Sequence, residues 1–112
     1  MTMFNLTRDI NGYNGFGRVQ SEDKYSATIT SLAAQTLIIP SNHAKWIAIF
    51  AYQDGSTVWV AVNGTAAIPA GATFAATTSE RNPLSWEVKA GDVLSFITPD
   101  TDADIGVVLY AL

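Results

Sequence analysis

The sequence predicts an all-β domain, and three observations support this prediction. Runs of about five to eight residues that are rich in Val, Ile, Thr and aromatic side chains follow one another along the chain. Short segments with Gly, Pro, Asn or Asp separate most of these runs. No segment shows the pattern of an amphipathic helix, in which apolar side chains recur every three or four residues between capping residues. Short strands that alternate with turns in this way are typical of a β-sandwich or a β-barrel.

Residues 1–24 differ from the rest and are predicted to form an irregular arm that precedes a β domain of residues 25–112. The stretch 11–17 holds three glycines, two asparagines and two aromatic residues, a composition that disfavours a helix or a regular strand. Two interpretations of the arm stay open. It is either a loop or frayed terminus, or a segment whose Tyr13 and Phe16 side chains dock onto a neighbouring surface.

The β domain is predicted strand by strand from residue 25 onward. Alanine is frequent, but breakers interrupt the alanine-rich segments, as in Ile68-Pro69-Ala70-Gly71-Ala72, so no helix is expected. The predicted strands are Tyr25–Leu32, Gln35–Ile39, Trp46–Tyr52, Thr57–Val62, Thr65–Ile68, Thr73–Thr78, Ser85–Val88, Val93–Thr98 and Ile105–Leu112. The predicted turns lie at 40–42, 54–55, 63–64, 69–71, 81–83, 90–92 and 99–100.

The dipeptide Asp54-Gly55 predicts a β-hairpin between the two runs that flank it. One face of this hairpin would be purely aliphatic and is predicted to be the core; it carries Ile47, Ile49, Ala51, Val58, Val60 and Val62. The other face would carry Trp46, Phe50, Tyr52 and Trp59. A solvated sheet face normally alternates to polar residues, so the aromatic face is expected to be covered. Either another part of the chain covers it, or these four residues form an interface with another protein.

Composition and charge exclude several classes of protein. Hydrophobic residues make up 48% of the chain and charged residues 14%, whereas about 25% is typical of soluble domains. The net charge is −4 and the basic residues are scattered singly, so no nucleic-acid partner is expected. The longest apolar run, Trp46–Tyr52, is too short to span a membrane, and no secretory signal is visible. We therefore expect synthesis in a cytoplasm. The absence of cysteine excludes disulfides and thiolate chemistry.

No catalytic residue, metal site or cofactor is expected from the motifs. The single histidine, His43, lies in a predicted turn, and no nucleophile elbow of the form G-x-S-x-G is present. Asp100, Asp102 and Asp104 have the spacing of the first ligands of an EF-hand, but Ile105 and Ala111 stand where Gly and Glu are required. An EF-hand is therefore excluded, and a looser cation site at these aspartates stays open.

Four segments of the sequence resemble the small decoration proteins, also called cement or staple proteins, of short-tailed bacteriophages. These segments are 31–40, 58–66, 68–74 and 89–96. The resemblance covers about residues 25–112. It implies a jelly-roll-like antiparallel β-sandwich on the outside of an icosahedral shell, where such proteins bridge adjacent major capsid subunits and often pair across local two-fold axes. It implies no catalytic residues.

The sequence thus predicts a non-enzymatic virion protein that decorates the outer capsid surface. Its expected partners are the major capsid protein and a second copy of itself, with no direct nucleic-acid or membrane contact. The alternative is a receptor- or carbohydrate-binding β module of a phage tail or fibre, in which Trp59 and Trp86 would stack on sugars. A small β-barrel enzyme is the least favoured hypothesis, because the chain has no cysteine and no second histidine.

Overall fold

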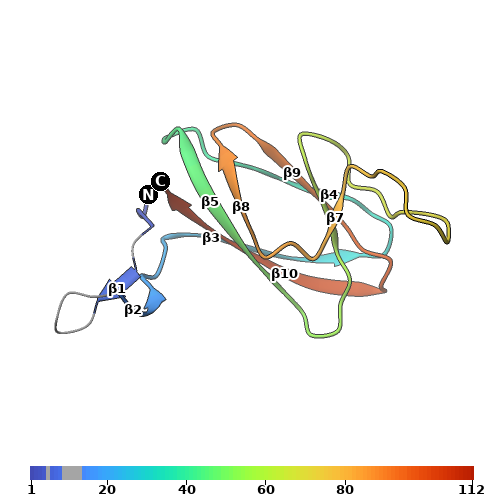
Figure 1. Ribbon diagram of the computed structural model, residues 1–112, viewed down its shortest axis with the longest axis horizontal. Coiled ribbons are helices and arrows are strands. Elements are labelled where there is room, and N and C mark those ends of the chain that lie inside the picture. Colours follow the sequence, from blue (N-terminus) through green and yellow to red (C-terminus); the bar gives the residue numbers. More distant parts are fainter. Residues whose placement is uncertain (5, 9–13) are drawn as a thin grey trace.

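The computed structural model describes the backbone of residues 1–4, 6–8 and 14–112, and the side chains outside residues 5–17 (Figure 1). The described residues form ten β-strands and no helix, which confirms the prediction of an all-β protein. The strands are β1 (Leu6–Arg8), β2 (Asn14–Arg18), β3 (Asp23–Thr30), β4 (Gln35–Ile38), β5 (Lys45–Tyr52), β6 (Trp59–Val62), β7 (Glu80–Arg81), β8 (Ser85–Lys89), β9 (Val93–Ile97) and β10 (Asp102–Ala111).

Eight of the strands form a jelly-roll sandwich. One four-stranded sheet has the order β3-β10-β5-β8 and the other the order β4-β9-β6-β7, and all neighbours are antiparallel. The pairs β3–β10, β4–β9, β5–β8 and β6–β7 are those of one long antiparallel ribbon. The further pairs β5–β10 and β6–β9 arise when this ribbon rolls up, which is the defining topology of a jelly roll. The predicted sandwich is confirmed.

The core lies between the two sheets and follows the two-residue period of the strands. Along β10, alternate residues from Ala103 to Ala111 point inward and are buried. The register places Leu109 opposite Ala48 and Ala111 opposite Trp46, so that a large side chain meets a small one. Val60 and Leu94 contribute from the facing sheet, and neither has any exposed surface.

The predicted hairpin around Asp54-Gly55 is wrong, because β5 and β6 belong to different sheets. The turn itself forms, and Gly55 adopts a left-handed φ of 76°. However, β5 already pairs with β10 on one side and β8 on the other, so it has no free edge to offer β6. Residues 53–58 therefore carry the chain across from one sheet to the other, along the green ribbon that continues from β5 in Figure 1.

The two faces of β5 are also the reverse of those predicted. Trp46 and Phe50 are buried between the sheets, whereas Ile47 and Ile49 lie on the outer face and are half-buried. The assignment of Val60 to the core is correct. Both faces of β5 are apolar, so its sequence pattern alone does not distinguish the inner face from the outer one.

Two predicted strands, Thr65–Ile68 and Thr73–Thr78, do not form. Residues 63–79 instead make a long excursion between β6 and β7. Its first part lies against the outer face of the β4-β9-β6-β7 sheet, where the Ala66 amide donates to Ser95 Oγ at 3.0 Å. Beyond this, Pro69 and Gly71, whose φ is +110°, interrupt any extended ladder. Apart from Phe74, the side chains of residues 72–78 are short and offer little apolar area to bury.

The N-terminal arm is more regular than expected. Its strands β1 and β2 pair antiparallel, with a register shift between Leu6 and Arg8. Near its start, residues 2–4 run parallel to the end of β10: the Phe4 amide donates to the Ala111 carbonyl at 2.9 Å, and the Ala111 amide donates to the Thr2 carbonyl at 2.7 Å. The arm is thus joined to the sandwich through the last residues of β10.

Candidate interaction surface

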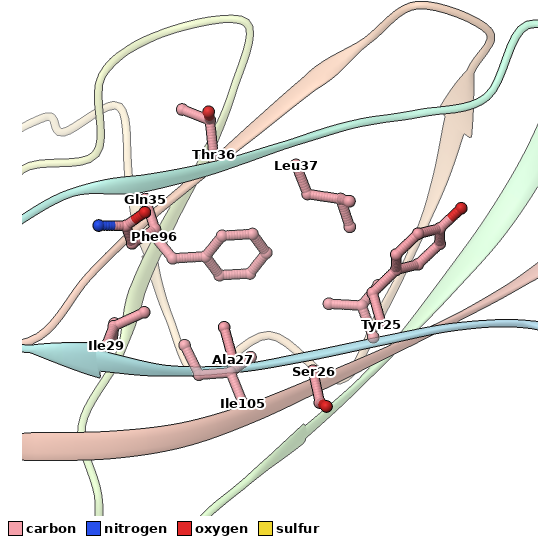
Figure 2. A pocket seen from close by; sticks show the side chains of 10 residues that line it. Tyr25, Ser26, Ala27, Ile29, Gln35, Thr36, Leu37, Phe96 and Ile105 are labelled. Carbon is pink, nitrogen blue, oxygen red and sulfur yellow. The ribbon is translucent and has the colours of Figure 1, made fainter.

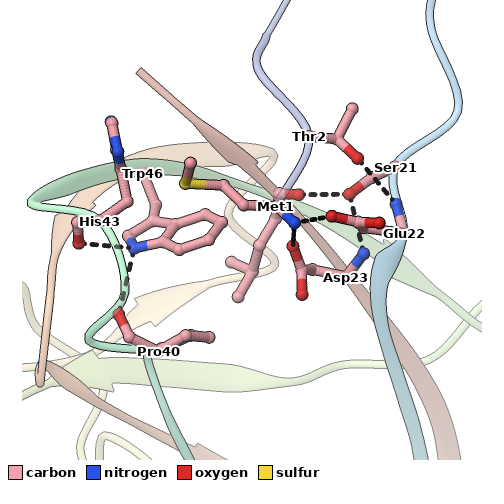
Figure 3. A network of polar contacts seen from close by, with 9 residues as sticks. Met1, Thr2, Ser21, Glu22, Asp23, Pro40, His43 and Trp46 are labelled. Atoms are coloured by element: carbon pink, nitrogen blue, oxygen red, sulfur yellow. Dashed lines mark hydrogen bonds and ion pairs between the residues drawn. The ribbon is translucent and has the colours of Figure 1, made fainter.

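The residues predicted to form an interface do not share one surface. Trp46 has no exposed area, and its indole N–H donates to the carbonyl oxygens of Pro40 and His43, at 3.1 Å each (Figure 3). Phe50 is 6% exposed and packs edge-on against Phe96 in the facing sheet. The placement of Trp46 and Phe50 on an outward face is therefore wrong, because both side chains complete the core.

The other predicted interface residues are scattered. Tyr52 is half-buried, and its hydroxyl donates to the Pro83 carbonyl at 2.6 Å. Burial, with a smaller contribution from Glu80, raises the pKa of this phenol above its usual value, so it stays protonated. Trp59 lies half-buried on the outer face of the β4-β9-β6-β7 sheet, beside residues 69–77 of the excursion. Tyr13 lies outside the described residues, and Phe16 belongs to β2 in the range whose side chains are not described.

Exposed apolar side chains are found instead at positions that the sequence patterns did not single out. Phe74 is fully exposed on the excursion, which carries no charged residue from 63 to 79. Leu84, in the turn between β7 and β8, is 79% exposed. Leu32, which precedes β4, and Ile38, the last residue of β4, are also exposed. The uncharged composition of residues 63–79 was the signal that could have drawn attention to Phe74.

The excursion is fastened at its base by a polar cluster around Asn63. The Asn63 side chain donates to Asp92 Oδ1 at 3.0 Å and accepts from the Val93 amide at 2.9 Å. Asp92 also accepts from the Lys89 amide at 2.9 Å. The hydrogen bond from the Asn63 side chain, followed by the one from the Lys89 amide, lowers the pKa of the Asp92 carboxyl. These contacts connect the start of the excursion to the β8–β9 turn.

A second apolar surface, here called the outer aliphatic face, covers the centre of the β3-β10-β5-β8 sheet. Val108 lies opposite Ile49, and Gly106 lies opposite Ala51. The Ile47, Ile49 and Val108 side chains on this face are all half-buried, so aliphatic groups meet solvent over a strip of two neighbouring strands. Surface aliphatic groups grouped in this way are a common feature of protein interfaces.

Tyr110 fastens the base of the arm to one end of this face. Its side chain is fully buried, although it is on the outward side of β10 opposite Ile47. The Tyr110 hydroxyl accepts a hydrogen bond from Arg18 and donates one to the Val19 carbonyl. The Phe4 ring packs edge-on against the Tyr110 ring, with centroids 5.5 Å apart. The arm therefore covers this end of the outer aliphatic face.

A polar network continues along the same junction (Figure 3). Ser21 Oγ donates to the Leu109 carbonyl at 2.5 Å and accepts from the Asp23 amide at 3.0 Å. The amide of Glu22 donates to Thr2 Oγ1 at 3.0 Å, and the carboxylate of Glu22 pairs with the Met1 ammonium group. The network holds residues 1–2 against the start of β3.

An apolar cleft of about 200 Å³ opens between β3 and β4, the two edge strands on one side of the sandwich (Figure 2). Leu37 and Phe96 project into it from one sheet, and Tyr25, Ala27 and Ile105 from the other. Tyr25 and Ala27 occupy inward positions opposite buried residues of β10, yet both are exposed because the two sheets separate at this edge.

The residues that were candidates for catalysis or cation binding make structural contacts within the fold. His43 Nε2 lies 2.5 Å from the Leu112 carbonyl oxygen, and its ring packs edge-on against Trp46. Asp100 accepts from the Thr57 amide at 2.8 Å, while Asp104 accepts from the Thr28 hydroxyl. Within the part of the chain that the structure describes, no three His, Cys, Asp or Glu side chains are grouped to hold a metal ion.

The described residues include no helix that is long and apolar enough to cross a membrane. A comparison with known proteins found no family, no curated protein and no solved structure that matches this chain.

Proposed function

We propose that this chain is a structural protein of a bacteriophage virion that decorates the outer capsid surface and bridges neighbouring major capsid subunits. One observation carries the proposal. The β1–β2 pair and the excursion of residues 63–79 extend from opposite ends of a molecule that measures 52 × 29 × 27 Å (Figure 1). A small rigid sandwich with an extension at each end has the form that bridging two neighbours requires.

The exposed side chains support a contact at the excursion. Phe74 presents a whole aromatic ring to solvent, and buried aromatic anchors contribute much of the binding energy at protein interfaces. No charge on residues 63–79 would have to be stripped of water when this surface is covered. The four segments that resemble decoration proteins all belong to the β4-β9-β6-β7 sheet, its connections or the excursion. This favours the excursion as one of the two contacts with the shell.

Many symmetry-related copies would make individually weak contacts effective. A protein that touches two subunits at once converts its second contact into an intramolecular event, so the seam is held more tightly than either contact alone would hold it. We also propose that two copies pair through the outer aliphatic face, because a two-fold interface needs one self-complementary patch. The chain would be made in the host cytoplasm and act without a cofactor or catalytic residue.

Cryo-electron microscopy of virions from the phage that encodes this chain tests the proposal. We expect the sandwich to lie over contacts between major capsid subunits, with the excursion against one subunit and the β1–β2 pair against its neighbour. Copies confined to the tail would favour the alternative of a receptor- or carbohydrate-binding module, and virions without the chain would refute both placements.

Co-sedimentation of the purified chain with capsids that lack it provides a second test. Phe74→Ser should reduce the amount bound at least about tenfold, since losing one buried aromatic anchor costs more than about 1.4 kcal/mol. Leu84→Ser is the matched control: Leu84 is also highly exposed but lies outside the excursion, so binding should be unchanged. Equal binding by the wild type and the Phe74 variant would remove the excursion from the interface.

A further inference from the structure

We propose that the cleft at the β7–β8 edge of the sandwich is a saccharide-binding subsite in which Trp86 is the stacking platform and Glu80 accepts hydrogen bonds from sugar hydroxyls. The cleft has a volume of about 480 Å³, opens to solvent, and lies on the opposite side of the sandwich from the β3–β4 cleft. Its lining residues are Val62, Thr77, Thr78, Ser79, Glu80 and Trp86.

Trp86 packs against the core at this edge. It occupies an inward position on β8 opposite Ala48, whose small side chain leaves room for the indole. The Phe50 ring meets it edge-on at 5.5 Å with an interplanar angle of 80°. Because β8 and β7 are the last strands of their sheets, the ring is only half-buried and the cleft reaches it. Its indole N–H makes no hydrogen bond with any described residue and remains able to donate.

Glu80 supplies the polar side of the cleft. It lies opposite Val60, an inward-facing position, and it is exposed because β7 is an edge strand. Its carboxylate forms no ion pair within the described part of the chain. The nearby Tyr52 hydroxyl donates to the Pro83 carbonyl, so it does not occupy the carboxylate. Both oxygens of Glu80 are thus available as acceptors.

The hydroxyl groups beside Glu80 complete the set of polar partners. Thr77 and Thr78 are exposed and line the cleft. The Ser79 amide donates to Thr77 Oγ1 at 3.3 Å, and Ser79 Oγ accepts from the Ala67 amide at 3.0 Å, which orders the backbone of this segment. An ordered backbone reduces the entropy that a ligand would otherwise lose on ordering the site.

This combination of groups matches a neutral pyranose. The C–H groups on one face of a sugar ring are slightly positive and pack on the negative face of an indole, while the ring hydroxyls donate to a carboxylate in charge-assisted hydrogen bonds. A quaternary ammonium ligand is less suited, because cages for such cations combine several aromatic rings and Trp86 is the single aromatic residue among those lining this cleft.

The cleft beside Trp59 offers a useful contrast. Its lining is mainly Ala, Gly, Pro and Phe, and Thr73 and Thr77 are the polar side chains that the described cleft contains. It has no carboxylate to accept hydrogen bonds from a sugar. We therefore assign the saccharide to Trp86 and not to Trp59. This assignment does not depend on the proposed role in the capsid.

Titration of the ¹⁵N-labelled full chain, followed by ¹H–¹⁵N NMR, tests the inference. The probes are the methyl pyranosides of glucose, galactose, mannose, rhamnose and N-acetylglucosamine, each added to about 50 mM, a concentration suited to the millimolar affinity of a shallow site. We expect at least one sugar to shift the indole N–H signal of Trp86. The signals of the buried Trp46 and of Trp59 should stay in place. No shift with any of the five sugars, or a shift at Trp59 instead, would overturn the proposal.

Variants of the two principal groups sharpen the test. Glu80→Gln changes an exposed side chain, so it should leave folding intact and weaken sugar binding at least about fivefold. Trp86→Phe keeps an aromatic ring against Phe50 and should weaken binding severalfold, whereas Trp86→Ala should abolish it. Glu87→Gln is the control, because Glu87 is exposed on the outer side of β8, the strand that carries Trp86. Sugar binding that survives in the Glu80 and Trp86 variants would place the ligand elsewhere.

Discussion

Replacing Trp46 by alanine should destabilise the protein far more than the same change at Trp59, and this pair of variants tests the assignment of faces. Trp46 has no exposed surface and fills the space between the sheets opposite Ala111. Trp59 is half-buried on an outer face, with the excursion on one side and solvent on the other. The aromatic-face prediction made from the sequence treated the two residues alike.

The expected difference follows from burial and hydrogen bonding. Truncation of a fully buried Trp to Ala costs about 3–5 kcal/mol. Loss of the indole N–H also leaves the Pro40 and His43 carbonyls without that donor, at a further cost of about 1 kcal/mol. A half-buried Trp59 forfeits only part of its transfer free energy, about 1–2 kcal/mol. Because small domains have about 5–15 kcal/mol of total stability, Trp46→Ala removes a large share of it.

Urea unfolding followed by circular dichroism measures the free energy of unfolding that each variant loses, and thermal unfolding measures the corresponding change in Tm. For a chain of this length, each kcal/mol shifts Tm by about 4 °C, so Trp46→Ala should melt about 16 °C or more below the wild type and Trp59→Ala about 4–8 °C below it. The slope of the free energy of unfolding against urea should change little, because both variants retain the fold. Equal losses for the two variants, or a loss below about 2 kcal/mol for Trp46→Ala, would refute the face assignment.

Three further outcomes are expected. Because the pKa of Asp92 is lowered in the folded state, its ionised carboxylate stabilises the fold fully above about pH 5. This stabilisation should be lost as the pH falls through the folded-state pKa of Asp92. The free energy of unfolding should therefore fall less steeply with acid in Asp92→Ala than in the wild type. Tyr110→Phe should cost about 1–3 kcal/mol and speed tryptic cleavage after Arg18, detected by mass spectrometry, and an unchanged cleavage rate would contradict the anchoring role. Gly91→Ala should cost about 1–2 kcal/mol, because φ is +81° at this residue. The added Cβ would meet no other atom there, so the cost comes from the backbone conformation alone. Gly64→Ala should be nearly neutral in the same urea assay.

The candidate surface was harder to predict than the fold. The sequence pattern predicts an interface of aromatic residues on a hairpin, but a sheet buries an aromatic residue as readily as it exposes one. Trp46 was hidden because loop carbonyls satisfy its N–H group inside the molecule. Phe74 is not marked by the sequence pattern because it lies in a stretch of β-forming residues. It is exposed because residues 73–78 pair with no strand in the part of the chain that the structure describes.

The sequence by itself determined the class of the protein, the positions of most strands and the turns between them. These properties depend on neighbours close in the chain: β-branched and aromatic runs, the glycines of the turns, and the breakers at 69–71. Tertiary structure alone decided which strands pair and which face of each is buried. The pairing of β3 with β10, or of β5 with β8, consists of backbone hydrogen bonds that any residue except proline can make, so local sequence does not encode it. The two apolar faces of β5 were distinguished only when the ribbon rolled up and brought the second sheet against one of them.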